Sequence, residues 1–134
     1  MNKHIITSVL FAFLGVYIMS KMNQPRGIRN NNPLNIRENH LNDEEWVGEH
    51  FLDIDKEFEE FESPVFGFFA ATRILKTYRE KYNLLSVSGI INRWAPPSEN
   101  DTQSYINSIS TKIGIKPDDV LLVSDYPKLI EAMI

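Results

Sequence analysis

The hydrophobic positions divide the chain into an apolar N-terminal segment and a longer part of mixed character. Residues 5–19 contain no charged side chain, and Lys3 and Lys21 flank them. A helix needs about 20 predominantly apolar residues to span a bilayer, and the segment 2–22 reaches that length if both lysines extend outward. We therefore expect residues 1–22 to form a single-pass transmembrane anchor helix and residues 23–134 to form one soluble domain. A cleaved secretory signal and a buried core helix are the alternatives.

The rest of the chain shows mostly helical periodicity. A hydroxyl cap at Ser63 followed by Pro64 predicts the start of a helix that runs to about Tyr82. The broad apolar stripe of this helix is typical of a central element packed on more than one side, and Gly67 and Ala71 would let another backbone approach. Three further helices are expected, over residues 86–94, over residues 98–113 and from residue 125 to the C-terminus.

A short alternating region precedes these helices. Residues 45–51 (EWVGEHF) and 56–61 (KEFEEF) predict two strands of a small β-hairpin. Their buried faces would come from Trp46, Val47, Phe51, Leu52, Phe58 and Phe61. The acidic run of Glu57, Glu59, Glu60 and Glu62 is interpreted as a solvated face. The predicted fold is therefore mainly α, with a small β-hairpin near the start of the soluble domain.

The segment 26–37, RGIRNNNPLNIR, has no helical or strand periodicity. Asn side chains compete for backbone hydrogen bonds, and Pro33 pushes Asn32 out of the α region. We expect a turn-like segment, which is either a surface connector or one polar wall of a ligand groove.

Charge and composition narrow the range of partners. The net charge is −4, and all 18 acidic residues follow residue 26, so a large basic field for nucleic acid is absent. Neutral glycans and protein surfaces are compatible with this charge. The chain has no cysteine, which excludes disulfides. His4, His40 and His50 lack the spacing of a metal site, and we expect no metal or other cofactor.

The densest polar cluster outside the Asn-rich segment is residues 93–102, RWAPPSENDT. Glycoside cleavage needs a carboxylic acid that holds a proton near neutral pH, and burial beside an aromatic ring such as Trp94 can raise a glutamate pKa for that purpose. Glu99 is therefore the first candidate acid, and Asp101 is a second carboxylate. Alternatively, Ser98 and Asp101 form a helix cap, and Glu99 only complements the helix dipole. Glu49, on the predicted hairpin, is another candidate; it is otherwise an exposed strand carboxylate.

Four pieces of sequence, in order, resemble a family of small phage virion and prophage proteins that are considered lysozyme-like and linked to peptidoglycan. They are RGIRNNNPLNIR (26–37), the W-x-G of Trp46 and Gly48, the F-x-x-F-x-S-P-x-x-G of residues 58–67, and RWAPPSENDTQSYI (93–106). The piece NNPLNIR is also similar to the N-x-x-G-I-K turn of cell-wall glucosaminidases.

The resemblance implies a lysozyme-like α+β fold with a groove for a sugar polymer. Residue by residue, it implies that the groove is lined by Asn32, Asn35, Trp46, Arg93, Trp94, Glu99, Asn100 and Thr102. One departure matters: glucosaminidases with the Asn turn carry their catalytic glutamate on a helix before it, where this chain has no acidic residue. Either Glu99 or Glu49 has replaced it, or the domain binds without cutting.

The leading interpretation is a membrane-anchored phage virion protein that cleaves peptidoglycan glycan strands during genome entry. It would reside in an internal virion membrane or the host inner membrane, and its partners would be glycan strands, lipid and capsid proteins. The cleaved bond stays open between muramidase, glucosaminidase and lytic transglycosylase chemistry. The alternatives are a non-catalytic virion protein that links membrane and capsid, and a glycan-binding module.

Overall fold

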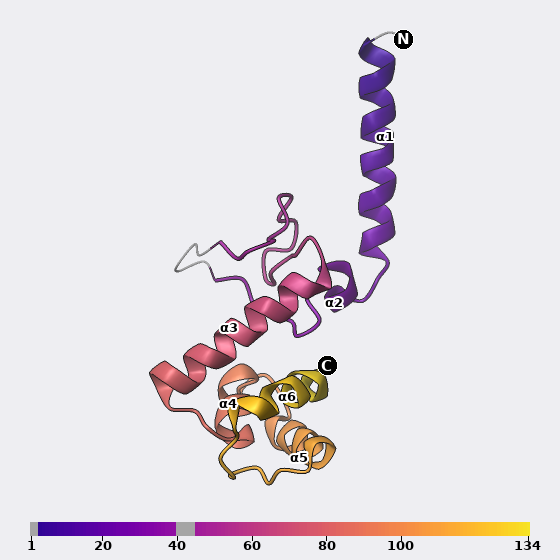
Figure 1. The fold of residues 1–134 in the computed structure, drawn as a ribbon. Coiled ribbons are helices and arrows are strands. Elements are labelled where there is room, and N and C mark those ends of the chain that lie inside the picture. Colours follow the sequence, from indigo (N-terminus) through magenta and orange to yellow (C-terminus); the bar gives the residue numbers. More distant parts are fainter. Residues whose placement is uncertain (1–2, 40–44) are drawn as a thin grey trace.

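The computed structural model describes residues 3–39 and 45–134, and these are mainly helical. The elements in chain order are α1 (Lys3–Met22), α2 (Arg26–Arg29), α3 (Pro64–Tyr82), α4 (Val87–Trp94), α5 (Thr102–Ile113), the 3-10 turn η1 (Val123–Asp125) and α6 (Tyr126–Met133). Helix α1 extends away from the rest of the molecule, while α4, α5 and α6 gather on one side of the long helix α3 (Figure 1).

Helix α3 has the predicted bounds, which confirms that element. Ser63 is extended before Pro64, and Asn83 ends the helix in a left-handed conformation with φ 53°. Gly67 is buried in the first turn, and a Cβ atom there would lie 2.8 Å from the carbonyl oxygen of Asn31. The predicted close approach of another backbone is therefore present, and the backbone in question belongs to the Asn-rich segment.

The three C-terminal helices also occur, with one boundary displaced. The Ser86 hydroxyl caps α4 by accepting a hydrogen bond from the Gly89 amide. Helix α5 begins at Thr102 instead of near Ser98, because Asp101 is the residue that caps it. Tyr105 on α5 donates a 2.7 Å hydrogen bond to the Met133 carbonyl, which joins α5 to the end of α6.

One core holds these elements together. It includes two residues of the Asn-rich segment, Leu34 and Ile36, which are 4% and 5% exposed. Phe61, just before α3, is also buried there, and the other buried members come from α3 to α6 and the segments between them, among them Leu75, Ile90, Ile91, Ile106, Ile109, Leu121 and Leu129. Because the Asn-rich segment contributes to the core, its polar residues are fixed relative to α3 and α4.

The predicted β-hairpin is wrong: the described residues contain no strand. Two isolated bridges, Arg37 with Phe58 and Glu49 with Phe61, are all that forms there. Residues 57–62 bond to two different segments, since the Glu59 amide donates to Ile36 and the Glu62 amide donates to Gly48. Side chains satisfy further amides: Glu60 accepts from Asp55 at 2.8 Å and also from Ile54. Backbone groups that are satisfied in this way cannot extend a ladder.

Some predicted core positions of this region are also wrong. Val47 and Phe51 are 74% and 84% exposed, because without a hairpin no second layer covers them. Phe61 is fully buried, as predicted. The acidic run is not a solvated face, since Glu59 and Glu60 are 2% and 5% exposed.

The predicted transmembrane anchor over residues 1–22 is wrong as well, and so is the single-pass membrane location that depended on it. Within residues 3–39 and 45–134, no helix combines the length and the apolar character that a membrane crossing requires. Helix α1 has 20 residues, but its uncharged stretch is only residues 5–19 and includes Thr7, Ser8 and Tyr17.

Candidate functional site

The Asn-rich segment begins with a single helical turn, α2, which corrects the prediction that all of residues 26–37 would be turn-like. Arg29 and Asn30 both donate to one carboxylate oxygen of Asp55, at 2.9 and 2.8 Å, and Arg26 lies 3.1 Å from the same oxygen. Burial by itself would raise the pKa of Asp55, but the hydrogen bonds and the positive charges outweigh it and lower that pKa. This cluster fixes α2 against the loop that carries Asp55.

The Asn32 side chain stabilises the conformation of the Asn-rich segment through buried hydrogen bonds. Its side chain is fully buried, its Nδ2 donates to the carbonyls of Ile36 and Glu59 at 2.9 and 3.0 Å, and its Oδ1 accepts from the Ile36 amide at 2.9 Å. All of these contacts are with backbone groups. The structure therefore places Asn32 behind the surface, where it positions the backbone of Glu59.

Two adjoining hollows, together called the trough here, lie between the Asn-rich segment and helix α4. The smaller hollow, of about 330 Å³, is lined among others by Asn35, Trp46, Glu59, Tyr78, Arg93 and Trp94. The larger, of about 480 Å³, is lined among others by Asn35, Arg37, Phe58, Trp94, Glu99 and Asn100. Asn35, Arg37 and Trp94 line both hollows, so the two adjoin at these residues.

Glu59 is the carboxyl group of the smaller hollow. Its Oε1 accepts a 3.0 Å hydrogen bond from Trp46 Nε1, and its Oε2 has no hydrogen-bond partner among the described residues. Burial, with the negative charges of Glu38 and Glu49 in addition, raises the pKa of Glu59 to about 8, and the indole hydrogen bond only partly opposes this. Glu59 is therefore protonated at neutral pH.

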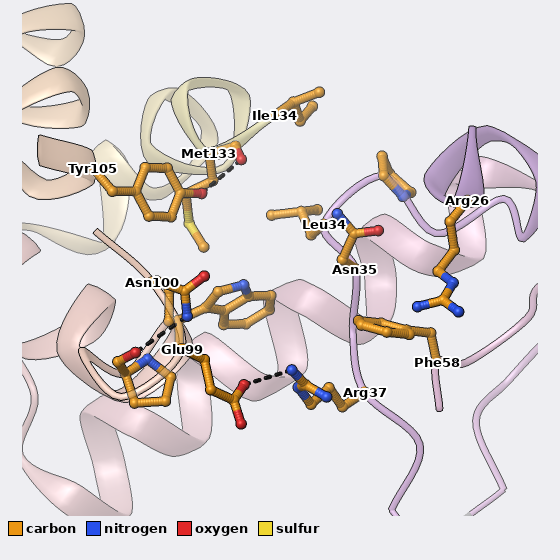
Figure 2. Close-up of a pocket in the computed structure, with 14 residues that line it drawn as sticks. Arg26, Leu34, Asn35, Arg37, Phe58, Glu99, Asn100, Tyr105, Met133 and Ile134 are labelled. Atoms are coloured by element: carbon orange, nitrogen blue, oxygen red, sulfur yellow. Dashed lines mark hydrogen bonds and ion pairs between the residues drawn. The ribbon is translucent and has the colours of Figure 1, made fainter. Parts of the chain in front are cut away.

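Glu99 belongs to the larger hollow and is an ion-paired carboxylate. Figure 2 shows its Oε2 pointing to the guanidinium of Arg37, at 2.6 Å. Both side chains are more than half exposed. The carboxyl predicted to be the acid is therefore exposed in an ion pair, without the burial that the prediction required.

The other predicted carboxylates have local structural partners. Asp101 accepts from the Ser104 amide at 3.2 Å, and the hydrogen bonds from Ser104 lower the pKa of Asp101. Glu49 accepts from the Trp46 amide at 2.9 Å and closes the loop that carries the indole. Neither carboxylate is among the residues that line the trough.

Of the remaining predicted groove residues, Asn35, Trp46, Arg93 and Trp94 line the smaller hollow. Asn100 lines the larger one, where its Nδ2 donates to the Pro96 carbonyl at 3.2 Å. Thr102 is buried and donates to the Ala95 carbonyl at 2.5 Å, so it stabilises the turn of residues 95–102 and does not face the hollow.

The sequence reasoning missed Glu59, Glu38, Arg37 and Tyr78. A usable signal existed for Glu59: in an extended segment, residues 59 and 61 share one face, and Phe61 was already assigned to the core. No group of three metal-ligating side chains occurs among the described residues. His40, one of the histidines weighed above, lies outside them.

No family model matches the chain. It is 54% identical over 109 residues to Protein P5 of Pseudoalteromonas phage PM2, an alignment that covers 81% of this chain and 68% of that protein. The chain belongs to the protein P5 family. This relationship supports the expectation of a bacteriophage virion protein, and it gives no support to the lysozyme-like family or to glycosidase activity.

Proposed function

We propose that this P5-family protein is a phage virion protein whose trough binds a peptidoglycan glycan strand and cleaves it, with Glu59 as the general acid. Cleavage of a glycosidic bond needs a carboxylic acid that gives its proton to the leaving oxygen as the C–O bond breaks. Glu59, in place of Glu99 or Glu49, takes this role. The bond attacked stays open between muramidase, glucosaminidase and lytic transglycosylase chemistry.

The observation that carries the proposal is the position of Glu59 in a hollow with two indole rings. Trp46 and Trp94 line the same cavity, and aromatic faces are suited to the apolar faces of sugar rings. Asn35, also on the wall, offers an amide to hydroxyl and acetamido groups. The raised pKa of Glu59 keeps its proton available at neutral pH.

A second carboxylate is needed to stabilise positive charge on the sugar or to activate water. Glu38 takes that role in this proposal, because its charge acts on Glu59 more strongly than that of Glu49. Its charge acts on the buried carboxyl of Glu59, which lines the smaller hollow.

The test uses the purified full chain and a suspension of peptidoglycan, with clearing and released fragments as readouts. Glu59→Gln should reduce cleavage by at least about 100-fold, the usual contribution of a general acid. Glu80→Gln is the matched control and should retain cleavage, because it removes an exposed carboxylate of α3 outside the trough lining. Loss of cleavage in Glu99→Gln with full retention in Glu59→Gln would refute the assignment of the acid.

A non-catalytic role in the particle is the second candidate. It is favoured by helix α1, where Phe13, Val16 and Met19 are 70%, 67% and 69% exposed. An apolar helix that stays uncovered is unusual for an isolated chain and is typical of a protein that docks in an assembly. Co-fractionation with capsid protein, in the absence of any released glycan fragment, would favour this role.

A further inference from the structure

Arg93 has an unusual environment at the wall of the smaller hollow. It lies in the last turn of α4, and its guanidinium carbon is 3.9 Å from the ring centre of Tyr82 and 5.2 Å from that of Tyr78. The two rings restrict the plane of the guanidinium without using all of its N–H donors. In the part of the chain that the structure describes, Arg93 makes no ion pair with a carboxylate.

The charges around it leave Arg93 uncompensated. Arg37, the other arginine of this hollow, is ion-paired with Glu99. Glu59, the carboxyl group of the same wall, carries its proton at neutral pH because its pKa is raised to about 8. Arg73 lies over the Trp46 ring, and Glu38 contributes negative charge on the side of Glu59. The end of the hollow at Arg93 therefore attracts anions.

We infer that Arg93 binds a carboxylate carried on the sugar strand, so that the trough selects glycan bearing acidic stem peptides over bare glycan. The guanidinium matches a carboxylate in geometry, because its parallel N–H groups can donate to both oxygens. Bare glycan of alternating N-acetylated sugars offers amides and hydroxyls, whereas peptide stems bring free carboxylates to every second sugar. The inference rests on the proposed function, since it names the substrate class of the same trough.

Binding is measured with the full chain carrying Glu59→Gln, so that cleavage does not consume the ligand. The two ligands are intact peptidoglycan and the same material after an amidase has removed its stem peptides. Sedimentation of the protein with each ligand gives the affinity. We expect binding to intact material to be roughly tenfold tighter, which is the effect of one charge-assisted contact.

Arg93→Gln should abolish this preference by weakening binding to the intact material only. Arg93→Lys keeps the charge over the tyrosine rings but loses the paired donors, so it should restore the preference in part. Lys116→Gln is the matched control, because it removes one positive charge at an exposed site outside the trough lining and should change neither affinity. Thermal unfolding of each variant establishes that it is folded.

The possible outcomes distinguish a failure of the role of Arg93 from a failure of the proposed function. Equal binding to both ligands, or an equal loss for both in Arg93→Gln, would overturn the role of Arg93 and leave glycan binding in place. Absence of binding to either ligand would overturn the proposed function and the inference with it.

Discussion

The indole Nε1 of Trp46 donates a 3.0 Å hydrogen bond to Oε1 of Glu59, and the two side chains share the wall of the smaller hollow. The hydrogen bond favours the charged form of the carboxyl, while burial and two neighbouring carboxylates favour the neutral form. The neutral form prevails, because these effects together raise the pKa of Glu59 to about 8.

Glu59 makes the stability of the fold depend on pH in a defined window. Its pKa is about 8 in the folded chain and 4.5 ordinarily, so the unfolded state releases the proton at lower pH than the folded state does. The contribution of Glu59 to the free energy of unfolding should be highest below about pH 4.5, fall between about pH 4.5 and 8, and level off above that. The fall is on the order of a few kcal/mol, given 1.36 kcal/mol for each pKa unit.

Urea unfolding at a series of pH values measures this dependence, and Glu59→Gln is the comparison. The amide cannot ionise, so the variant should lose the decline and be more stable than the native chain at pH 8. An identical pH dependence in both proteins would show that Glu59 is not the group responsible.

Replacement of Trp46 by Phe should raise the pKa of Glu59 further. The substitution removes the one hydrogen bond that favours the charged carboxylate and leaves the charges of Glu38 and Glu49 in place. Carbon-13 NMR titration of the Glu59 carboxyl measures the pKa directly. A pKa that falls in Trp46→Phe would contradict the prediction and would indicate that water replaces the indole.

Asn32→Ala should destabilise the protein by on the order of 3 kcal/mol. It leaves the amide of Ile36 and the carbonyl of Glu59 without their buried partners, and it removes one of the two hydrogen bonds to the Ile36 carbonyl. Urea unfolding measures the loss, and Asn92→Ala on the exposed face of α4 is the control, with a change within about 0.5 kcal/mol. Similar effects of the two substitutions would mean that the buried hydrogen bonds of Asn32 do not stabilise this segment.

Gly67→Ala should cost about 1–3 kcal/mol, because the new Cβ would lie 2.8 Å from a backbone oxygen, that of Asn31, which cannot move freely. Gly89→Ala in α4 is the matched control: its Cβ would meet the Ser86 hydroxyl at 3.4 Å, an ordinary contact. That control should be neutral or stabilising, since Ala favours helix. Differential scanning calorimetry distinguishes the two, and equal melting temperatures would argue against tight docking of the Asn-rich segment on α3.

Local signals in the sequence were sufficient for the helices after residue 62. A Ser-Pro start, a Pro-Pro stop and a glycine terminus act through neighbouring backbone groups, so α3, α4 and the end of α5 could be predicted. The start of α5 was misplaced because Ser98 and Asp101 are both good caps, and only the geometry of the turn selects Asp101.

Local signals could not show that the β-hairpin fails to form or that Glu59 is buried. Residues 57–62 bond to segments 20 or more positions earlier, at Asn30 and Ile36, as well as to nearby His50 and Gly48. Alternating apolar and polar residues indicate that one face of a segment is buried, but they do not indicate which other segment covers that face. The acidic run was therefore predicted to be a solvated face. In the structure, Asn32 and Trp46 donate hydrogen bonds to Glu59, which is buried.

The sequence by itself determined where α3, α4 and α6 form and that Asn35, Trp46, Arg93 and Trp94 belong to polar and aromatic clusters, because those properties are local. Only the tertiary structure decided which carboxyl is buried beside the indole and which is ion-paired at the surface. The pKa of a glutamate depends on the burial and the charges that distant segments bring to it, and these exist only once the Asn-rich segment has packed against α3.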